Sequence, residues 1–267
     1  MREPRQTLRL LGVLQFTLRA FKYSQTWESS TEEQTLVSCA HDEKITNSSN
    51  PLKSYFDSHR EGKGIWKWIH YFDIYQRHFK KFIGRDVRVL EIGVYSGGSL
   101  EMWREYFGSN CRVYGVDVEE ACKVYENDRT QIFVGDQADR EFWRTFKKEI
   151  PAIDILIDDG GHLPEQQIIT LEEMLPHLRP GGIYLCEDVQ GDINGFTSYV
   201  HGLTAKLNSA LSKPVDQEKG ISCSTTQFQS AIHSIHLYPF VVVIEKTAIP
   251  VNQFIAPKHG TEWQPFL

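Results

Sequence analysis

Two acidic runs in the second half of the chain each follow a short β-branched segment. Ile155-Leu156-Ile157 leads into Asp158-Asp159-Gly160-Gly161-His162, and the segment Ile183 to Cys186 leads into Glu187-Asp188. Adjacent parallel strands would bring both runs to the same edge of a sheet. Crowded carboxylates resist desolvation unless a cation or protons intervene, and Mg²⁺ prefers oxygen ligands. We therefore expect Asp159, Glu187 and Asp188 to bind Mg²⁺ or another divalent cation, although acidic loop ends that simply face solvent remain an alternative.

A histidine lies three residues after Asp159. An imidazole with a pKa near its usual value of about 6.5 can accept a proton from a hydroxyl at neutral pH. His162 is therefore the candidate general base, close to the metal without necessarily binding it, and Asp159 belongs to the same catalytic group.

A glycine-rich turn follows an earlier β-branched segment. The run from Val89 to Ser99 has the spacing G-x-x-x-G-G, whereas the dinucleotide fingerprint is G-x-G-x-x-G, so an NAD-dependent oxidoreductase is disfavoured. Glycine lets a backbone turn sharply and approach a ligand closely. Asp117 ends the next β-branched segment, where a carboxylate can bind ribose hydroxyls, and Asp136 and Gln137 follow the third, suitably placed for an adenine amino group.

In this order, Glu91-Ile92-Gly93-x-x-x-Gly97, Asp117 and Gly135-Asp136 resemble the cofactor motifs of class I S-adenosylmethionine (SAM) dependent methyltransferases. The resemblance implies that Gly93 and Gly97 shape a loop around the methionine part of SAM and that Asp117 binds its ribose. Glu91 would hold that loop or the ammonium group, and Ser99 belongs to the same cofactor set.

The pattern Asp-Asp-Gly-Gly-His followed by Glu-Asp resembles a narrower group, the metal-dependent sugar O-methyltransferases of macrolide biosynthesis and the related cephalosporin hydroxylase-like proteins, over roughly residues 60–190. The resemblance implies that Asp159, His162, Glu187 and Asp188 supply the base and the magnesium ligands, and that Asp158 faces the cofactor. We expect Mg²⁺-assisted methyl transfer from SAM to a hydroxyl of a small molecule, a sugar or a natural-product diol. A cephalosporin hydroxylase-like protein and a non-catalytic SAM-binding protein are the alternatives.

The elements that would position these residues alternate between β-branched and helical segments. This rhythm predicts an α/β fold with a doubly wound, mostly parallel, Rossmann-like sheet; the methyltransferase resemblance implies seven strands. The six strands that the sequence locates are Val87 to Ile92, Arg112 to Val116, Gln131 to Val134, Ile153 to Ile157, Ile183 to Cys186 and Phe240 to Ile244. Helices are expected at Ser99 to Phe107, Asp139 to Glu149, Glu165 to His177 and Phe196 to Leu211.

Apolar residues from Ile65 to Phe82 recur at three- and four-residue steps, which predicts one amphipathic helix. Trp66 and Trp68 in this stretch would then belong to the core rather than to a pocket. Residues 1–50 are expected to be an N-terminal extension, partly helical and partly flexible, and residues 51–267 to be the methyltransferase domain.

The composition of the chain limits the kinds of molecule that it is expected to bind. A net charge of −6 argues against broad contact with nucleic acid, and the apolar stretch within residues 1–22 is too short and too charged to span a membrane. Five widely spaced cysteines fit reduced thiols in the cytoplasm, although residues 1–22 leave organellar targeting open. A homo-oligomer is possible. His177, His201, His233 and His236 have no acidic partner at ligand spacing, so we expect them to be structural or exposed.

Overall fold

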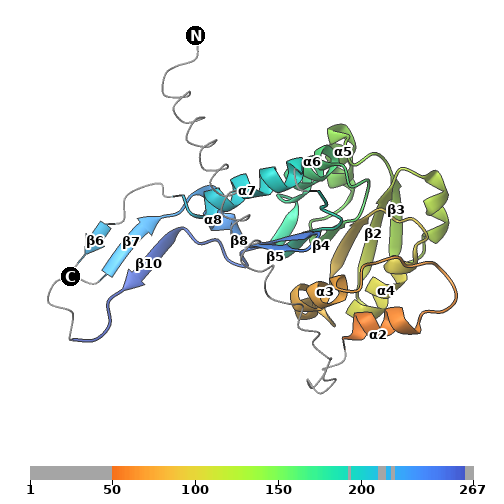
Figure 1. Cartoon of the computed structure of the whole chain (residues 1–267), viewed down its shortest axis with the longest axis horizontal. Coiled ribbons are helices and arrows are strands. Elements are labelled where there is room, and N and C mark those ends of the chain that lie inside the picture. The colour runs from red at the N-terminus through yellow and green to blue at the C-terminus, as the bar shows by residue number, and fades with distance from the viewer. Residues whose placement is uncertain (1–49, 192–193, 210–214, 218–219, 262–267) are drawn as a thin grey trace, which may run out of the picture. The chain divides into compact units, whose positions relative to one another are not determined.

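A computed structural model describes residues 50–191, 194–209, 215–217 and 220–261, which belong to one unit, Ser49–Leu267 (Figure 1). The predictions of a partly helical, partly flexible N-terminal extension and of targeting by residues 1–22 concern residues 1–49, which lie outside the described residues. No helix within the described ranges is long and apolar enough to cross a membrane.

A seven-stranded sheet has the order β3-β2-β1-β4-β5-β9-β8. The neighbouring pairs from β3 to β5 are parallel, whereas β9 runs antiparallel to both β5 and β8. The bounds are β1 Arg88–Ile92, β2 Arg112–Asp117, β3 Thr130–Val134, β4 Ile153–Asp158, β5 Leu178–Cys186, β8 Ile232–Tyr238 and β9 Val241–Lys246. The predicted doubly wound, mostly parallel sheet is confirmed, and β8 is the strand that the sequence patterns did not locate.

Helices cover both faces of this sheet (Figure 1). Successive strand residues point to opposite faces, so Val89 and Ile155 enter a core with the helices α2, α3 and α4, while Leu90 and Leu156 enter a second core with α5, α6 and α7. The bounds are α2 Pro51–Ser58, α3 Tyr71–Phe79, α4 Gly98–Phe107, α5 Arg140–Glu149, α6 Pro164–Met174 and α7 Gly195–Leu207. Short 3₁₀ helices are η1 Lys80–Phe82 and η2 Glu120–Tyr125.

A second, three-stranded antiparallel sheet has the order β10-β7-β6, with β6 Val215–Gln217, β7 Gly220–Ser224 and β10 Gln253–Pro257. The short helix α8 Gln227–Ala231 leads from this sheet into β8. The sequence patterns predicted neither element.

The helix predicted from Ile65 to Phe82 is wrong in its first turn and a half. The α-helix begins only at Tyr71, and residues 65–68 have no regular secondary structure. The reason is tertiary: the Lys67 ammonium reaches Asp159 and Glu187 at the carboxyl edge of the sheet, and this segment crosses that edge as a loop. Trp66 and Trp68 are consequently exposed rather than in the core.

Candidate active site

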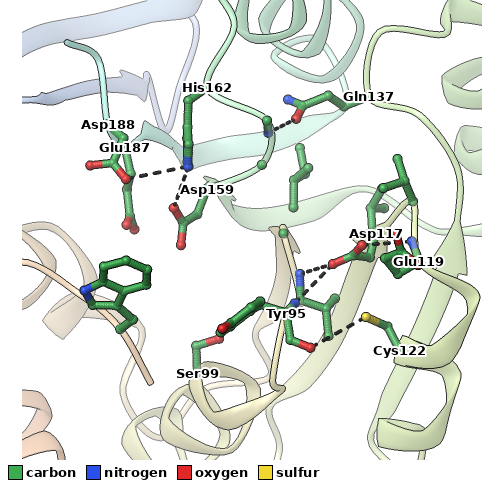
Figure 2. A pocket seen from close by; sticks show the side chains of 18 of the residues that line it. Tyr95, Ser99, Asp117, Glu119, Cys122, Gln137, Asp159, His162, Glu187 and Asp188 are labelled. Carbon is green, nitrogen blue, oxygen red and sulfur yellow. Dashed lines mark hydrogen bonds and ion pairs between the residues drawn. The ribbon is translucent and has the colours of Figure 1, made fainter. Parts of the chain in front are cut away.

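A cavity of about 1010 Å³ opens at the carboxyl edge of the parallel strands (Figure 2). Its walls come from the residues that follow β1 to β5 and from the loop that precedes α3. Nine of the predicted site residues line it: Gly93, Ser99, Asp117, Asp136, Gln137, Asp159, His162, Glu187 and Asp188. Glu91, Gly97 and Asp158 are not in its wall.

Backbone strain concentrates around this cavity. Among the described residues, four that are not glycine have positive φ angles: Tyr95, His162, Asp188 and Phe240. The first three line the cavity, and the ring of Phe240 packs 5.8 Å from that of Trp68, another lining residue. Such conformations cost about 1–3 kcal/mol each and gather at functional sites. The strain therefore marks this edge of the sheet as the functional one.

The glycine turn after β1 is shaped by close backbone contact. Gly93 has φ 85°, and a Cβ there would lie 2.0 Å from the carbonyl oxygen of Asp159. Gly97 has φ 73° and precedes α4, where a Cβ would lie 2.7 Å from the ring of Tyr125. Both positions need glycine, and the turn lies directly against the loop that carries Asp159.

Asp117 organises the cofactor side of the cavity. One carboxylate oxygen accepts hydrogen bonds from the backbone N–H groups of Val94 (2.8 Å) and Tyr95 (3.1 Å), and the other accepts one from Glu119 (2.9 Å; Figure 2). Ionised carboxylates offer about four lone-pair sites, so one site remains for a ligand hydroxyl. Glu119 is exposed in the cavity wall. We did not single it out from sequence, although its place two residues after a strand end is a usable signal.

Glu91 lies behind the turn, fully buried, and its Oε2 atom accepts a hydrogen bond from the Ser99 hydroxyl (2.7 Å). This contact ties β1 to the first turn of α4. Burial raises the pKa of the Glu91 carboxyl, while the charge of Lys67 opposes that shift. Its Oε1 atom has no hydrogen-bond partner, although the Lys67 ammonium is 3.5 Å away.

Gln137 and Asp158 form a buried pair under the loop that follows β4. The Gln137 amide donates to Asp158 Oδ1 (2.9 Å), and its oxygen accepts from the Gly161 N–H (2.7 Å). The Tyr184 hydroxyl donates to Asp158 Oδ2 (3.1 Å). Burial raises the pKa of Asp158 to about 6. The side chain of Asp158, the last β4 residue, is 1 % exposed and does not line the cavity, so in this structure it supports the loop from below through Gln137.

His162, Asp159 and Asp188 meet at the rim of the cavity (Figure 2). The Nε2 atom of His162 lies 3.9 Å from Asp159 Oδ1 and 3.7 Å from Asp188 Oδ2. One ligand atom from each of the three residues falls within 4.8 Å of the other two, which is close enough for one shared metal ion. All three side chains are partly exposed to the cavity.

Lys67 is the residue that sequence reasoning missed. Its ammonium, only 3 % exposed, lies 2.5 Å from Asp159 Oδ2, 3.0 Å from Glu187 Oε2 and 3.5 Å from Glu91 Oε1. Burial alone would lower the pKa of Lys67, but the charges of Asp159, Glu187 and Glu91 outweigh burial and hold it well above its usual range. A permanent cation therefore sits among three of the carboxylates.

Aromatic side chains from α3 and the preceding loop hold the Glu187-Asp188 pair. Tyr75 donates to Glu187 Oε1 (2.6 Å), while Tyr71 (2.8 Å) and the Trp68 indole N–H (3.0 Å) donate to Asp188 Oδ1. With Lys67 on Oε2, both oxygens of Glu187 already have donors. Burial raises the pKa of Glu187 to about 8, with Lys67 opposing that shift. The three predicted metal ligands are thus unequal: Asp159 and Asp188 each keep an oxygen toward His162, and Glu187 does not.

Residues 90–189 match the family model described as "Methyltransferase domain". The match covers 100 of the 267 residues of the chain. The chain is 37 % identical over 132 residues to demethylmacrocin O-methyltransferase of Streptomyces fradiae, covering 46 % of this chain and 33 % of that protein. It is 38 % identical over 130 residues to mycinamicin VI 2''-O-methyltransferase of Micromonospora griseorubida, covering 46 % and 32 %. The matching part spans about a third of the length of these relatives.

The fold of the chain also matches solved structures. A methyltransferase of the mycinamycin biosynthetic pathway, in complex with Mg and SAH, superposes with a TM-score of 0.59 at 27 % identity, covering 74 % of this chain and 54 % of that one. A second structure of the same enzyme, with Mg, SAH and mycinamycin VI, gives a TM-score of 0.58 at 26 % identity, covering 74 % and 53 %. The class I methyltransferase fold predicted from the sequence is confirmed.

Proposed function

We propose that this chain transfers a methyl group from SAM to a hydroxyl oxygen of a small molecule, with a sugar hydroxyl as the acceptor. One observation carries the proposal: a single cavity joins the Gly93 turn and Asp117 to the rim formed by His162, Asp159 and Asp188. A donor at one end and a hydroxyl beside a base at the other is the arrangement that methyl transfer requires. Both relatives are named O-methyltransferases, which favours this activity over a hydroxylase-like alternative.

The cavity wall fits SAM. Gly93, Gly135 and Gly160 line it, and a Cβ at the first would meet the backbone of Asp159 while one at Gly160 would meet Gln137. Asp117 and Glu119 offer carboxylate oxygens for ribose hydroxyls, and Asp136 lies exposed beyond β3 for the adenine end. When bound, SAM supplies an electrophilic methyl group attached to a sulfonium. These residues would hold the donor in place while Glu91 and Ser99 brace the turn from behind.

The rim fits a hard divalent cation. Asp159 Oδ1 and Asp188 Oδ2 are the free carboxylate oxygens, and hard cations prefer such oxygens. Mg²⁺ would supply Lewis acidity toward the acceptor oxygen. Asp159 and Asp188 would hold it in the arrangement described here; Glu187 would join them only after Lys67 or Tyr75 releases one of its oxygens.

His162 would take the proton from the acceptor hydroxyl. Its ring is 41 % exposed and lines the cavity, and its Nε2 atom lies 3.9 Å from Asp159 Oδ1 and 3.7 Å from Asp188 Oδ2. Positioned proton transfer of this kind contributes about 10²–10⁴-fold to a rate. The exposed indoles of Trp66 and Trp68 line the same cavity and offer apolar faces to a sugar ring.

Calorimetric titration with SAM, with and without Mg²⁺, tests the cofactor assignment. Incubation with SAM and a panel of glycosides and vicinal diols, followed by mass spectrometry, tests for a product heavier by one methylene unit. Asp188→Asn should weaken binding of Mn²⁺, read by electron paramagnetic resonance, while Glu187→Gln should weaken it less. Binding of NADH without binding of SAM would end the methyltransferase proposal.

A further inference from the structure

A cluster of two imidazoles and a carboxylate lies away from the cavity, between α3 and the antiparallel edge of the sheet. His78 on α3, His236 on β8 and Glu245 on β9 each offer one ligand atom within 4.8 Å of the other two. We propose that this cluster is a second metal site, for a transition-metal ion such as Zn²⁺, and that the ion clamps α3 onto β8 and β9.

The geometry is close to that of a bound ion. His78 Nδ1 lies 2.6 Å and His236 Nε2 lies 3.8 Å from Glu245 Oε1. Zinc–ligand distances of roughly 2.0–2.1 Å at tetrahedral angles place ligand atoms about 3.3 Å apart. The first separation must open by about 0.7 Å and the second must close by about 0.5 Å, which small side-chain rotations provide. The two rings lie edge to face, with centroids 4.7 Å apart at 64°.

Hydrogen bonds from neighbouring side chains orient His78 and Glu245, as they commonly do for residues that bind a metal. The other ring nitrogen of His78 contacts the Tyr238 hydroxyl (2.9 Å), and Lys81 donates to the other oxygen of Glu245 (3.2 Å). Such partners fix ring orientation and ligand basicity in metal sites. The Ser234 hydroxyl contacts His236 Nε2 at 2.9 Å, and this contact must be exchanged for the metal.

Two imidazoles and one carboxylate form a ligand set that Zn²⁺ takes in proteins. Lys81 and Arg77 are the cations that oppose a metal here. Imidazole ligands favour Zn²⁺, Cu²⁺ or Ni²⁺ over Mg²⁺, which separates this site from the acidic rim in its choice of metal.

The position of His78 gives the site a structural consequence. Tyr71 and Tyr75 on the same helix hold Asp188 and Glu187. An ion that fixes α3 to the sheet edge would therefore steady Asp188 at the rim and the neighbouring Glu187. The sequence expectation that His236 lacks an acidic partner is wrong, because Glu245 reaches it from the neighbouring antiparallel strand.

The test uses the full chain, free of any affinity tag, with His162→Ala so that the rim has lost its imidazole. Zn²⁺ is titrated by calorimetry in excess Mg²⁺, and Co²⁺ replaces it for visible absorption. We expect one ion per chain, an intense tetrahedral Co²⁺ band and a higher melting temperature with Zn²⁺.

Adding His236→Ala, a half-exposed position, should weaken Zn²⁺ binding more than about 100-fold and remove the Co²⁺ band. Glu245→Gln should weaken binding as well, and His201→Ala, an exposed histidine on α7, is the matched control that should change nothing. Absence of stoichiometric binding, or binding that survives His236→Ala unchanged, would overturn the proposal.

Discussion

Replacing Lys67 by methionine tests how the acidic rim, the carboxylates of Glu91, Asp159, Glu187 and Asp188, is held together. Methionine keeps most of the apolar stem but leaves Glu91, Asp159 and Glu187 without the ammonium that lies 2.5 to 3.5 Å from each of them. Removing one partner of a buried ion pair costs about 3–5 kcal/mol. At about 2–4 °C per kcal/mol for a domain of this size, the melting temperature should fall by roughly 6–20 °C.

The loss should depend on pH. Glutamate and aspartate in an unfolded chain have pKa values near 4. In the folded variant, burial without the Lys67 ammonium raises the pKa values of these carboxyls above that. The folded state of the variant then binds more protons than the unfolded state, so its stability falls as pH rises above about 4. Urea unfolding of Lys67→Met should therefore show the full penalty at pH 8.5 and a smaller one at pH 5.5.

Lys63→Met is the matched control. Lys63 lies in the same loop and pairs with Glu101 at 2.8 Å, but both side chains are at least a third exposed, so its removal should cost no more than about 1 kcal/mol. A Lys67→Met penalty below about 1 kcal/mol, or one equal at both pH values, would refute the account of Lys67 as the cation that neutralises the rim.

Three further outcomes follow from the site. Burial raises the pKa of Glu187 to about 8, above the unfolded value of about 4.3. The stabilisation by Glu187 is therefore complete below pH 4 and is lost as pH rises toward 8. Glu187→Gln should flatten the dependence of the unfolding free energy on pH in this range, measured by urea unfolding with chelator present. His162→Ala should leave SAM affinity within about twofold but lower methyl transfer about 10²–10⁴-fold, and unchanged turnover would remove His162 from the mechanism. Gly93→Ala would place a Cβ 2.0 Å from the Asp159 carbonyl oxygen. This variant should lower SAM affinity more than Gly84→Ala, where a Cβ would meet nothing within 4 Å. Equal effects of the two variants on SAM affinity would contradict the importance of the close approach at Gly93.

Much of the fold could be predicted because local patterns and global architecture agree. The β-branched runs before the Gly93 turn and before Asp159 are strands, and the residues just after them line the cavity. β8 was missed because Ile232–Tyr238 mixes three polar residues into an edge strand with one weakly covered face. Such a strand lacks the continuous apolar run of a central parallel strand.

Lys67 could not be found from spacing. Its neighbours fit a helical period, in which a lysine between two tryptophans reads as a solvated position. Only the tertiary fold shows that the loop turns this side chain toward Glu91, Asp159 and Glu187, which are 24 to 120 residues away along the chain. Asp158 and Asp159 illustrate the same limit, because adjacent residues at a strand end point in different directions and the sequence does not say which faces the cavity.

The acidic rim therefore has two halves with different needs for a cation. Lys67 neutralises the inner half, formed by Glu91, Glu187 and one oxygen of Asp159, from within the protein. The outer half, Asp159 Oδ1 and Asp188 Oδ2, faces the cavity beside His162. Because the buried carboxylates do not depend on a dissociable ion, removing divalent metal with a chelator should change the free energy of unfolding by less than about 0.5 kcal/mol, the range typical of exposed positions, while methyl transfer falls. A large drop in stability on chelation, in a His236→Ala chain that lacks the second metal site, would show instead that the ion holds the buried carboxylates together.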